Sequence, residues 1–312
     1  MSTNNLEEDE KIMMCCASCG IAQVDNIKLK TCTACKSVRY CSVNCQKEHR
    51  PQHKKACTKR AAEIRDEILF RQPEGTDMGD CPICLLPLPI DDNDKTRIMG
   101  CCSKIICIGC DYSNTVRELE QSLPRKCPFC RHPMPKTEEE AELIAVTRVE
   151  ANDPVALQIM GFRRYGEGDY EGAFQYWIKA AELGNTSAHY HLSVMYRKGQ
   201  GGVEKDMKKG LHHLEQAAIG GHLDARFILG CIEKVTNVSP ERAVKHFIIA
   251  AKLGHDDSMK KLAEFFTMGF ISKEELTSTL RAHHAAVAAS KSPQREAGEE
   301  AARKFEAAKV AG

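Results

Sequence analysis

Residues 173–188, AFQYWIKAAELGNTSA, set a pattern that returns twice, as GLHHLEQAAIGGHLDA at 210–225 and as AVKHFIIAAKLGHDDS at 243–258. The three stretches begin 37 and then 33 residues apart. Equivalent positions hold a small residue (Ala173, Gly210, Ala243), a bulky apolar residue (Trp177, Leu214, Phe247), an alanine pair (Ala180–Ala181, Ala217–Ala218, Ala250–Ala251), a glycine (Gly184, Gly221, Gly254) and a second small residue (Ala188, Ala225, Ser258). Such a period is typical of helix-pair repeats, in which glycine ends one helix and neighbouring units must stack to bury their apolar faces.

These columns resemble the Sel-one-like repeats, relatives of the tetratricopeptide repeats. The middle unit, with MYRKGQGGVEKD, is the best match, whereas the third has EKVTNVSPE in place of the Gly-rich loop. We expect the repeats to occupy residues 153–271 and a connecting helix to lie in 136–152, opened by a capping box of Thr137 and Glu140. Residues 272–312 are expected to form a capping helix and a C-terminal tail.

Cysteine dominates the chain before the repeats, where 16 of the 17 cysteines lie between Cys15 and Cys130. The start, MSTNNLEEDEK, is acidic and lacks the apolar core of a secretory signal, so this density favours metal ligation in a reducing compartment over disulfides. Eight donors fall within residues 15–57 at spacings suited to tetrahedral zinc, namely Cys16, Cys19, Cys32, Cys35, Cys41, Cys45, His53 and Cys57. A segment this short needs zinc to fold, because it cannot bury enough apolar surface.

This string of donors, with Tyr40 directly before Cys41, resembles the MYND zinc finger. The resemblance implies a peptide-binding module with two interleaved zinc sites. One site would consist of Cys16, Cys19, Cys41 and Cys45, and the other of Cys32, Cys35, His53 and Cys57. Arg50 stands where family members often carry Trp, so we expect the docking surface to differ from the proline-rich-peptide groove of some relatives.

Two neighbours of these donors are expected to play no part in zinc binding. Cys15 breaks the two-residue gap to Cys19 and is interpreted as a spare thiol, and His49 is interpreted as a solvated helix residue. Residues 1–14 are expected to be a flexible N-terminus. Residues 58–80 are expected to form a charged helix followed by a linker, since they end in the breaker-rich stretch QPEGTDMGD.

A second cluster within residues 81–135 again consists of paired cysteines, Cys81 with Cys84, Cys101 with Cys102, Cys107 with Cys110 and Cys127 with Cys130. It resembles a RING zinc finger, which implies a cross-braced module with two zinc ions. The resemblance extends to Ile83 and Pro128, which would contact a ubiquitin-conjugating enzyme, and to Arg131, at the position of a linchpin that restrains ubiquitin. We expect a short helix in SNTVRELEQSL, starting at Ser113 or Asn114.

One RING ligand is missing, because Lys104 stands three residues before Cys107, where the family usually has His. Cys101, His132 or water would then complete the second site. Cys101 is the nearest of these, and Gly100 makes the turn between adjacent cysteine ligands easier. The sequence therefore predicts an all-cysteine variant of the module.

The expected fold is mainly α and multidomain, with two small zinc modules followed by an α-solenoid. The MYND and RING resemblances imply about four zinc ions and a RING-type ubiquitin ligase without a covalent intermediate, whose finger and repeats recruit protein or peptide partners. The alternative is a non-catalytic zinc-finger scaffold. A formal charge of +1 and the lack of ~18 consecutive apolar residues argue against nucleic acid and membranes as partners, and a cytoplasmic or nuclear location is expected. The pairs His212–His213 and His283–His284 are interpreted as surface residues.

Overall fold

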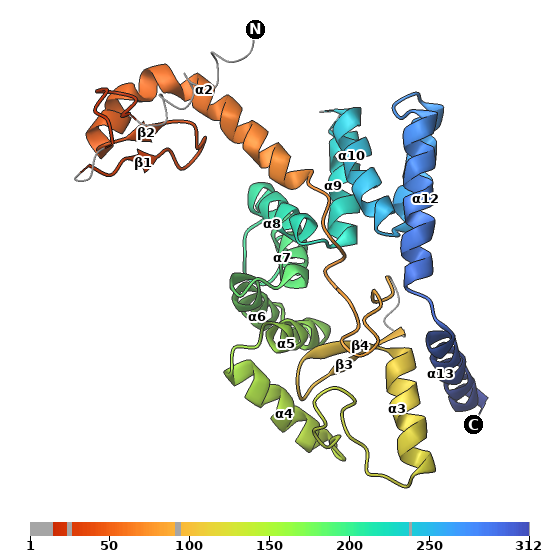
Figure 1. Ribbon diagram of the computed structural model, residues 1–312. Coiled ribbons are helices and arrows are strands. Elements are labelled where there is room, and N and C mark those ends of the chain that lie inside the picture. Colours follow the sequence, from red (N-terminus) through yellow and green to blue (C-terminus); the bar gives the residue numbers. More distant parts are fainter. Residues whose placement is uncertain (1–14, 24–26, 91–94, 237–238, 312) are drawn as a thin grey trace. The chain divides into compact units, whose positions relative to one another are not determined.

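The computed structural model describes residues 15–23, 27–90, 95–236 and 239–311 (Figure 1). The chain divides into two compact units, Met1–Arg71 and Gln72–Gly312. Each unit is described by itself.

The first unit contains a short antiparallel strand pair and one long helix. Strand β1 (Lys30–Thr31) pairs with β2 (Arg39–Tyr40), and helix α2 (Val43–Leu69) follows, with the Ser42 side chain accepting a hydrogen bond from the Cys45 backbone N–H. The helix expected within residues 58–80 is thus the second half of a helix that already begins inside the finger. Cysteines and Tyr40 make up the buried cluster of this unit, so its core is a potential metal centre rather than an aliphatic one.

The second unit begins with a zinc module made of a β-hairpin and a helix. Strand β3 (Thr96–Met99) pairs with β4 (Lys104–Cys107), and helix α3 (Ile108–Glu120) follows directly. The helix start expected at Ser113 or Asn114 was wrong, because the stretch between Cys107 and Cys110 already forms the first helical turn. Near the end of this helix Leu119 is 70% exposed.

Helix α4 (Glu138–Glu150) connects this module to the repeats. The Thr137 hydroxyl accepts a hydrogen bond from the Glu140 backbone N–H, as in a capping box, but the Glu140 carboxylate accepts from the backbone N–H of Lys136 and not from that of Thr137. The repeat helices are α5 (Pro154–Gly166), α6 (Tyr170–Glu182), α7 (Thr186–Lys198), α8 (Met207–Ile219), α9 (Leu223–Val235), α10 (Pro240–Lys252) and α11 (Asp256–Thr267). Consecutive helices pack in pairs, α5 with α6, α7 with α8 and α9 with α10, as a helix-pair repeat requires.

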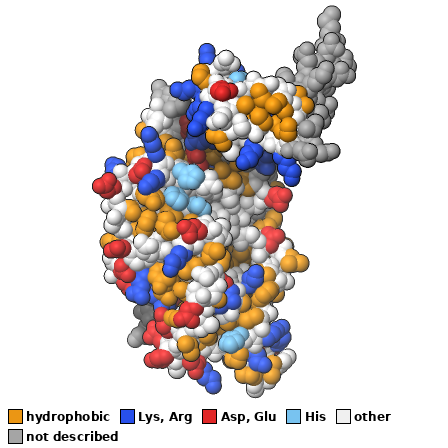
Figure 2. All heavy atoms as spheres, turned by 90° about the vertical axis from the view of Figure 1, so that its left-hand side faces the viewer, with side chains coloured by type: hydrophobic (Ala, Val, Ile, Leu, Met, Phe, Trp, Pro, Cys, Tyr) orange, Lys and Arg blue, Asp and Glu red, His pale blue; other side chains and the backbone are white. Residues whose placement is uncertain are grey.

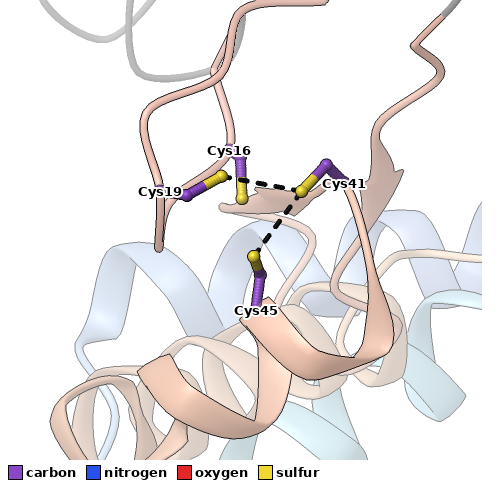
Figure 3. A group of neighbouring side chains, drawn as sticks. All are labelled: Cys16, Cys19, Cys41 and Cys45. Carbon is purple, nitrogen blue, oxygen red and sulfur yellow. Dashed lines mark hydrogen bonds between the residues drawn. The ribbon is translucent and has the colours of Figure 1, made fainter.

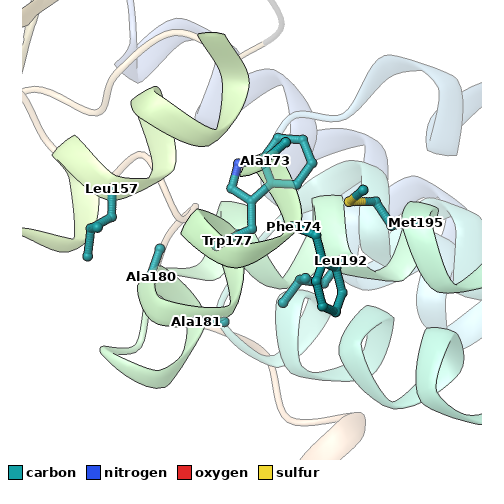
Figure 4. Packing of buried hydrophobic residues seen from close by; sticks show 9 residues of the cluster. Leu157, Ala173, Phe174, Trp177, Ala180, Ala181, Leu192 and Met195 are labelled. Carbon is teal, nitrogen blue, oxygen red and sulfur yellow. The ribbon is translucent and has the colours of Figure 1, made fainter. Parts of the chain in front are cut away.

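The repeat columns form the core of this array, and Figure 4 shows the cluster around Trp177 of the first repeat. Trp177, Leu214 and Phe247 are each at most 2% exposed, and both alanines of the first small column, Ala173 and Ala243, are fully buried. The indole of Trp177 stacks on His191, with ring centroids 4.5 Å apart, and donates a hydrogen bond of 3.1 Å to the Gln158 carbonyl. The column glycines have φ of 84°, 92° and 98°, so each ends its helix in a conformation that favours glycine (Gly184, Gly221, Gly254).

Two further helices follow the repeats, α12 (Lys273–Ala289) and α13 (Pro293–Ala311). Helix α12 packs on α10 and α11, as expected of a cap. Helix α13 packs on α3 of the zinc module instead, and Figure 1 shows the two side by side. His283, interpreted as a surface residue, is 7% exposed in α12 and lies 2.9 Å from Asp256, so that interpretation was wrong.

Charged side chains are mixed on the face of the molecule shown in Figure 2, where acidic and basic groups alternate with apolar ones. This mixture agrees with the formal charge of +1. Within the described residues, every helix falls short of the length and apolar character that a bilayer-spanning segment needs.

Candidate metal centres

Four tetrads of potential ligands assemble in the described part of the chain, each with its ligand atoms within 4.8 Å of one another. They are Cys16, Cys19, Cys41 and Cys45; Cys32, Cys35, His53 and Cys57; Cys81, Cys84, Cys107 and Cys110; and Cys101, Cys102, Cys127 and Cys130. Both modules are therefore cross-braced, since each tetrad takes its members from two separate places in the chain. All 17 cysteines are free thiols, so the tetrads are not disulfide clusters.

The distances within the tetrads fit a tetrahedral metal. With zinc–sulfur bonds of about 2.3 Å, two sulfurs on one zinc ion lie about 3.8 Å apart. In the first tetrad the Sγ atom of Cys41 is 3.6 Å from that of Cys19 and 3.5 Å from that of Cys45, and Figure 3 shows the four side chains converging. Four donors close such a site and leave no position for a reactive water, which is the arrangement of structural zinc.

Four of the five C-x2-C pairs share a tight turn after the second cysteine, whereas Cys107 and Cys110 lie at the start of α3. In three of them the N–H of the first cysteine donates to the carbonyl five residues later, at 2.8–2.9 Å (Cys16 to Ile21, Cys81 to Leu86, Cys127 to His132). The residue after the second cysteine takes a left-handed conformation, with φ of 75°, 57°, 58° and 65° at Gly20, Lys36, Leu85 and Arg131. Three of these four residues are not glycine, so the tight turn is held at a conformational cost that metal binding can offset.

Backbone N–H groups in these turns stabilise thiolates, the form that binds zinc. Burial raises the pKa of the Cys16 thiol, but hydrogen bonds from the backbone of Cys19, Cys41 and Ser18 outweigh burial and lower that pKa to about 6. The pKa of Cys32 falls to about 6 for the same reasons, with the main donor at Cys35. In the second module a hydrogen bond from the Cys107 side chain, together with backbone donors, lowers the pKa of Cys81 to about 4.

The second tetrad contains the only histidine among the four described groups. His53 lies on α2, one helical turn before Cys57, and its Nε2 atom is 3.2 Å from the Cys35 Sγ atom. Its ring stacks on His49 at a centroid distance of 5.5 Å, and His49 Nδ1 lies 3.0 Å from the Tyr40 hydroxyl. His49 thus lies on α2 and outside the tetrad, as expected, but it is half-buried rather than fully solvated. The spacing of four residues between His49 and His53 was the signal for the contact between their rings, because such residues share one helix face.

The third and fourth tetrads form the second module. Cys84 and Cys107 have Sγ atoms 3.8 Å apart in the third tetrad. In the fourth, the Sγ atom of Cys101 lies 3.3 Å from that of Cys130, and the Sγ atom of Cys102 lies 3.9 Å from that of Cys127. The structure thus gathers Cys101 into the fourth tetrad.

The other two residues considered at this position lie elsewhere. The ammonium group of Lys104 sits over the Phe129 ring, 5.9 Å from its centroid. His132 is exposed and is not a member of the tetrad, although its backbone carbonyl supports the turn. Adjacent cysteines can both reach the site because Ser103, directly after them, has φ of 55° and closes a turn onto the Met99 carbonyl at 2.7 Å. We retain the eight-cysteine ligand set as a prediction.

The three residues expected to contact a conjugating enzyme lie in the turns of the second module. Ile83 is 40% exposed, and its neighbour Leu85 is 73% exposed. Pro128 is half-buried next to Phe129, which is 41% exposed. Arg131 is exposed, and its guanidinium group donates to the Asn114 side chain at 3.4 Å.

Comparison with known proteins assigns families to two regions. The MYND finger model matches residues 16–57, and the Sel1 repeat model matches residues 155–185, 186–222 and 230–255. The expected MYND finger and Sel1 repeats are therefore confirmed, and the chain contains both.

Similarity to individual proteins is partial. An uncharacterized protein of Neisseria meningitidis is 33% identical over 48% of this chain and 32% of its own length. Chitin synthase regulatory factor 4 of Schizosaccharomyces pombe is 31% identical over 28% of this chain and 14% of its own length. A crystal structure of a Sel1 repeat protein from Oxalobacter formigenes is 24% identical, with a TM-score of 0.43 over 51% of this chain and 49% of its own. The chain spans about a third of the length of the first relative.

Proposed function

We propose that this protein is a RING-type ubiquitin ligase, in which the module at residues 81–135 positions a ubiquitin-loaded conjugating enzyme. The MYND finger and the Sel1 repeats would recruit the substrate or anchor the ligase in a complex. The observation that carries the proposal is the pair of apolar, solvent-facing turns on a cross-braced module with two tetrads. One turn holds Ile83 and Leu85, and the other holds Pro128 and Phe129.

The exposed apolar side chains on these turns do not contribute to the buried core of the module, so their apolar character points to another role. Ile83 and Leu85 expose 40% and 73% of their surface, although Cys81 beside them is fully buried. Contiguous exposed apolar residues commonly mark a site for a protein partner. A conjugating enzyme is the partner that the RING resemblance implies for such a surface.

Arg131 is the third element of the proposed site. Its left-handed backbone conformation, with φ of 65°, belongs to the turn of Cys127 and Cys130, so its position depends on the fourth tetrad. The Asn114 side chain links the guanidinium group of Arg131 to the Lys126 carbonyl and thereby ties this turn to α3. In the proposed role Arg131 would hold ubiquitin against the carrier.

The reaction itself would take place on the carrier. The amine of a substrate lysine attacks the thioester carbonyl, the carbon–sulfur bond breaks, and ubiquitin leaves the conjugating enzyme as an amide on the lysine. This chain would contribute orientation, which can supply several kcal/mol of the barrier by removing translational and rotational freedom. Closed four-donor zinc sites suit this role because they hold shape without taking part in the chemistry.

The proposal is tested by a chain-formation assay with activating enzyme, a broad panel of conjugating enzymes, ubiquitin and ATP. The wild-type protein should form ubiquitin chains with at least one carrier. Arg131→Ala and Ile83→Ala should each reduce the rate, whereas Arg281→Ala, an exposed arginine on α12, should leave it unchanged. Folded, zinc-loaded protein that forms no chains with any carrier would rule the ligase out.

A second candidate function is favoured by the two confirmed families. MYND fingers and Sel1 repeats are protein-interaction modules, and together they already make a binding scaffold. In that case the module at 81–135 would serve as a third binding surface. For either function we propose a cytoplasmic or nuclear location. Zinc binding by the sixteen proposed ligands requires reduced thiols and a neutral imidazole, and these compartments keep thiols reduced.

A further inference from the structure

Arg295, in the first turn of α13, reaches into the second zinc module and contacts Cys84, which lies 211 residues earlier in the chain. Its side chain is among the most deeply buried in the chain, at 2% exposure. The guanidinium group donates to the Leu86 carbonyl at 3.0 Å and to the Pro87 carbonyl at 2.5 Å, and it lies 3.4 Å from the Cys84 Sγ atom. It also donates to the Ser290 carbonyl at 2.6 Å, which fixes the turn between α12 and α13.

The helix that carries Arg295 is fitted closely to the module. A Cβ atom added at Gly109 of α3 would lie 2.7 Å from the Gln294 carbonyl oxygen, and one added at Gly298 of α13 would lie 2.9 Å from the Ile108 carbonyl oxygen. Glycine at both positions therefore lets the two backbones approach within contact distance. The Gln294 side chain adds a hydrogen bond of 2.9 Å to the Ser113 hydroxyl.

Charge explains why an arginine can be buried at this place. Burying a guanidinium group is costly unless anions compensate its charge. Four thiolates around a zinc ion carry a net charge of −2, because four negative charges outweigh the two positive ones of the metal.

We propose that α13 is an integral part of the second zinc module and that Arg295 is a positioning residue for its third tetrad. Arg295 would hold the Cys84 thiolate and the following turn, and the tetrathiolate site would in turn hold α13 in place. Zinc binding at this tetrad and docking of α13 are then linked, so each strengthens the other by the same factor. Residues that form hydrogen bonds to a metal ligand commonly change the affinity of the site for its metal.

This linkage reaches from the end of the repeat region to the first turn of the module. The turn held by Arg295 contains Leu86 and Pro87 and begins directly after Ile83 and Cys84. Helix α13 contacts α3 through Gly109 and Ser113. The proposal goes beyond ubiquitin transfer and holds whether or not the protein is a ligase, since its test measures zinc.

The test compares zinc affinity in full-length variants by competition with a chromophoric chelator, with native mass spectrometry to count the ions that remain. Arg295→Met removes the charge and keeps much of the side-chain volume, and we expect one zinc ion to be bound about 10–100-fold more weakly. Arg295→Lys should lie between Met and wild type, because it retains the charge but loses the fork of donors. Arg303→Met, at an exposed site on α13, is the matched control and should bind zinc as wild type does.

Gly298→Ala provides an independent arm that leaves the Arg295 side chain intact. Its methyl group would meet backbone atoms of Ile108 and Gly109 at 2.9–3.0 Å, so α13 must shift away from α3. We expect weaker binding of one zinc ion and faster hydrogen exchange in α13. Gly166→Ala, where nothing lies within 4 Å of the added atom, should change neither. Wild-type zinc affinity in both Arg295→Met and Gly298→Ala, with the repeats still folded, would overturn the proposal.

Discussion

His246, in α10, should make the stability of the repeat array depend on pH. Its side chain is fully buried. Burial, followed by the nearby positive charges of Arg226 and Arg242, lowers the pKa of His246 from 6.5 to about 3. The folded array therefore keeps this imidazole neutral, whereas the unfolded chain binds a proton near pH 6.5.

The sign and size of the effect follow from proton linkage. Between the two pKa values the unfolded state binds more protons, so the free energy of unfolding rises with pH, and this contribution is complete above 6.5 and lost as the pH falls toward 3. For pKa values of 6.5 and about 3, lowering the pH from about 7.5 to about 5.5 removes about 1.4 kcal/mol. His191 and His213, whose pKa values burial lowers to about 4, add to the same trend.

The assay is urea unfolding of wild-type protein and His246→Leu at both pH values, followed by circular dichroism. The drop in unfolding free energy on acidification should be smaller in His246→Leu by about 1.4 kcal/mol. Comparing two variants cancels the pH dependence of zinc binding, which both share. Ile248→Ala, a neighbouring core change in α10, should lower stability but keep the wild-type drop. An equal drop in His246→Leu and wild type would refute the reasoning.

Two further predictions concern the cores. Trp177→Ala should destabilise the array by about 3–5 kcal/mol, because it removes a buried indole, its stack on His191 and its hydrogen bond. Urea unfolding measures this loss of stability. A loss below about 1 kcal/mol would contradict the observed packing. Chelation of zinc should make residues 16–57 sensitive to limited proteolysis, while the array of residues 153–271 stays resistant. Of these two regions the finger lacks an apolar core and the array has one. Equal sensitivity of both regions would contradict this prediction.

The repeat array could be predicted from the sequence because a periodic pattern reports directly on burial. Trp177, Leu214 and Phe247 were equivalent by column, and all three are core residues. The cysteine spacing identified the potential zinc ligands, whereas their grouping into tetrads was what the MYND and RING resemblances implied. The fourth tetrad contains Cys101 and not Lys104. This choice could be predicted from chemistry, because a protonated amine cannot bind zinc.

Contacts between distant segments could not be predicted in the same way. Nothing local to Arg295 indicates a partner near Cys84, because the contact joins positions 211 residues apart. Gly109 and Gly298 gave no signal, since glycine in a helix is ordinarily a weak position rather than a point of close approach.

Zinc content tests the central claim, a complete second module in which Cys101 takes the place of the usual histidine. Native mass spectrometry after competition with a chelator should count four zinc ions in wild-type protein, from four tetrads, and three in Cys101→Ser. Cys231→Ser, which changes a thiol outside the tetrads, should retain four. Four firmly held ions in Cys101→Ser, or three in the wild type, would contradict the account.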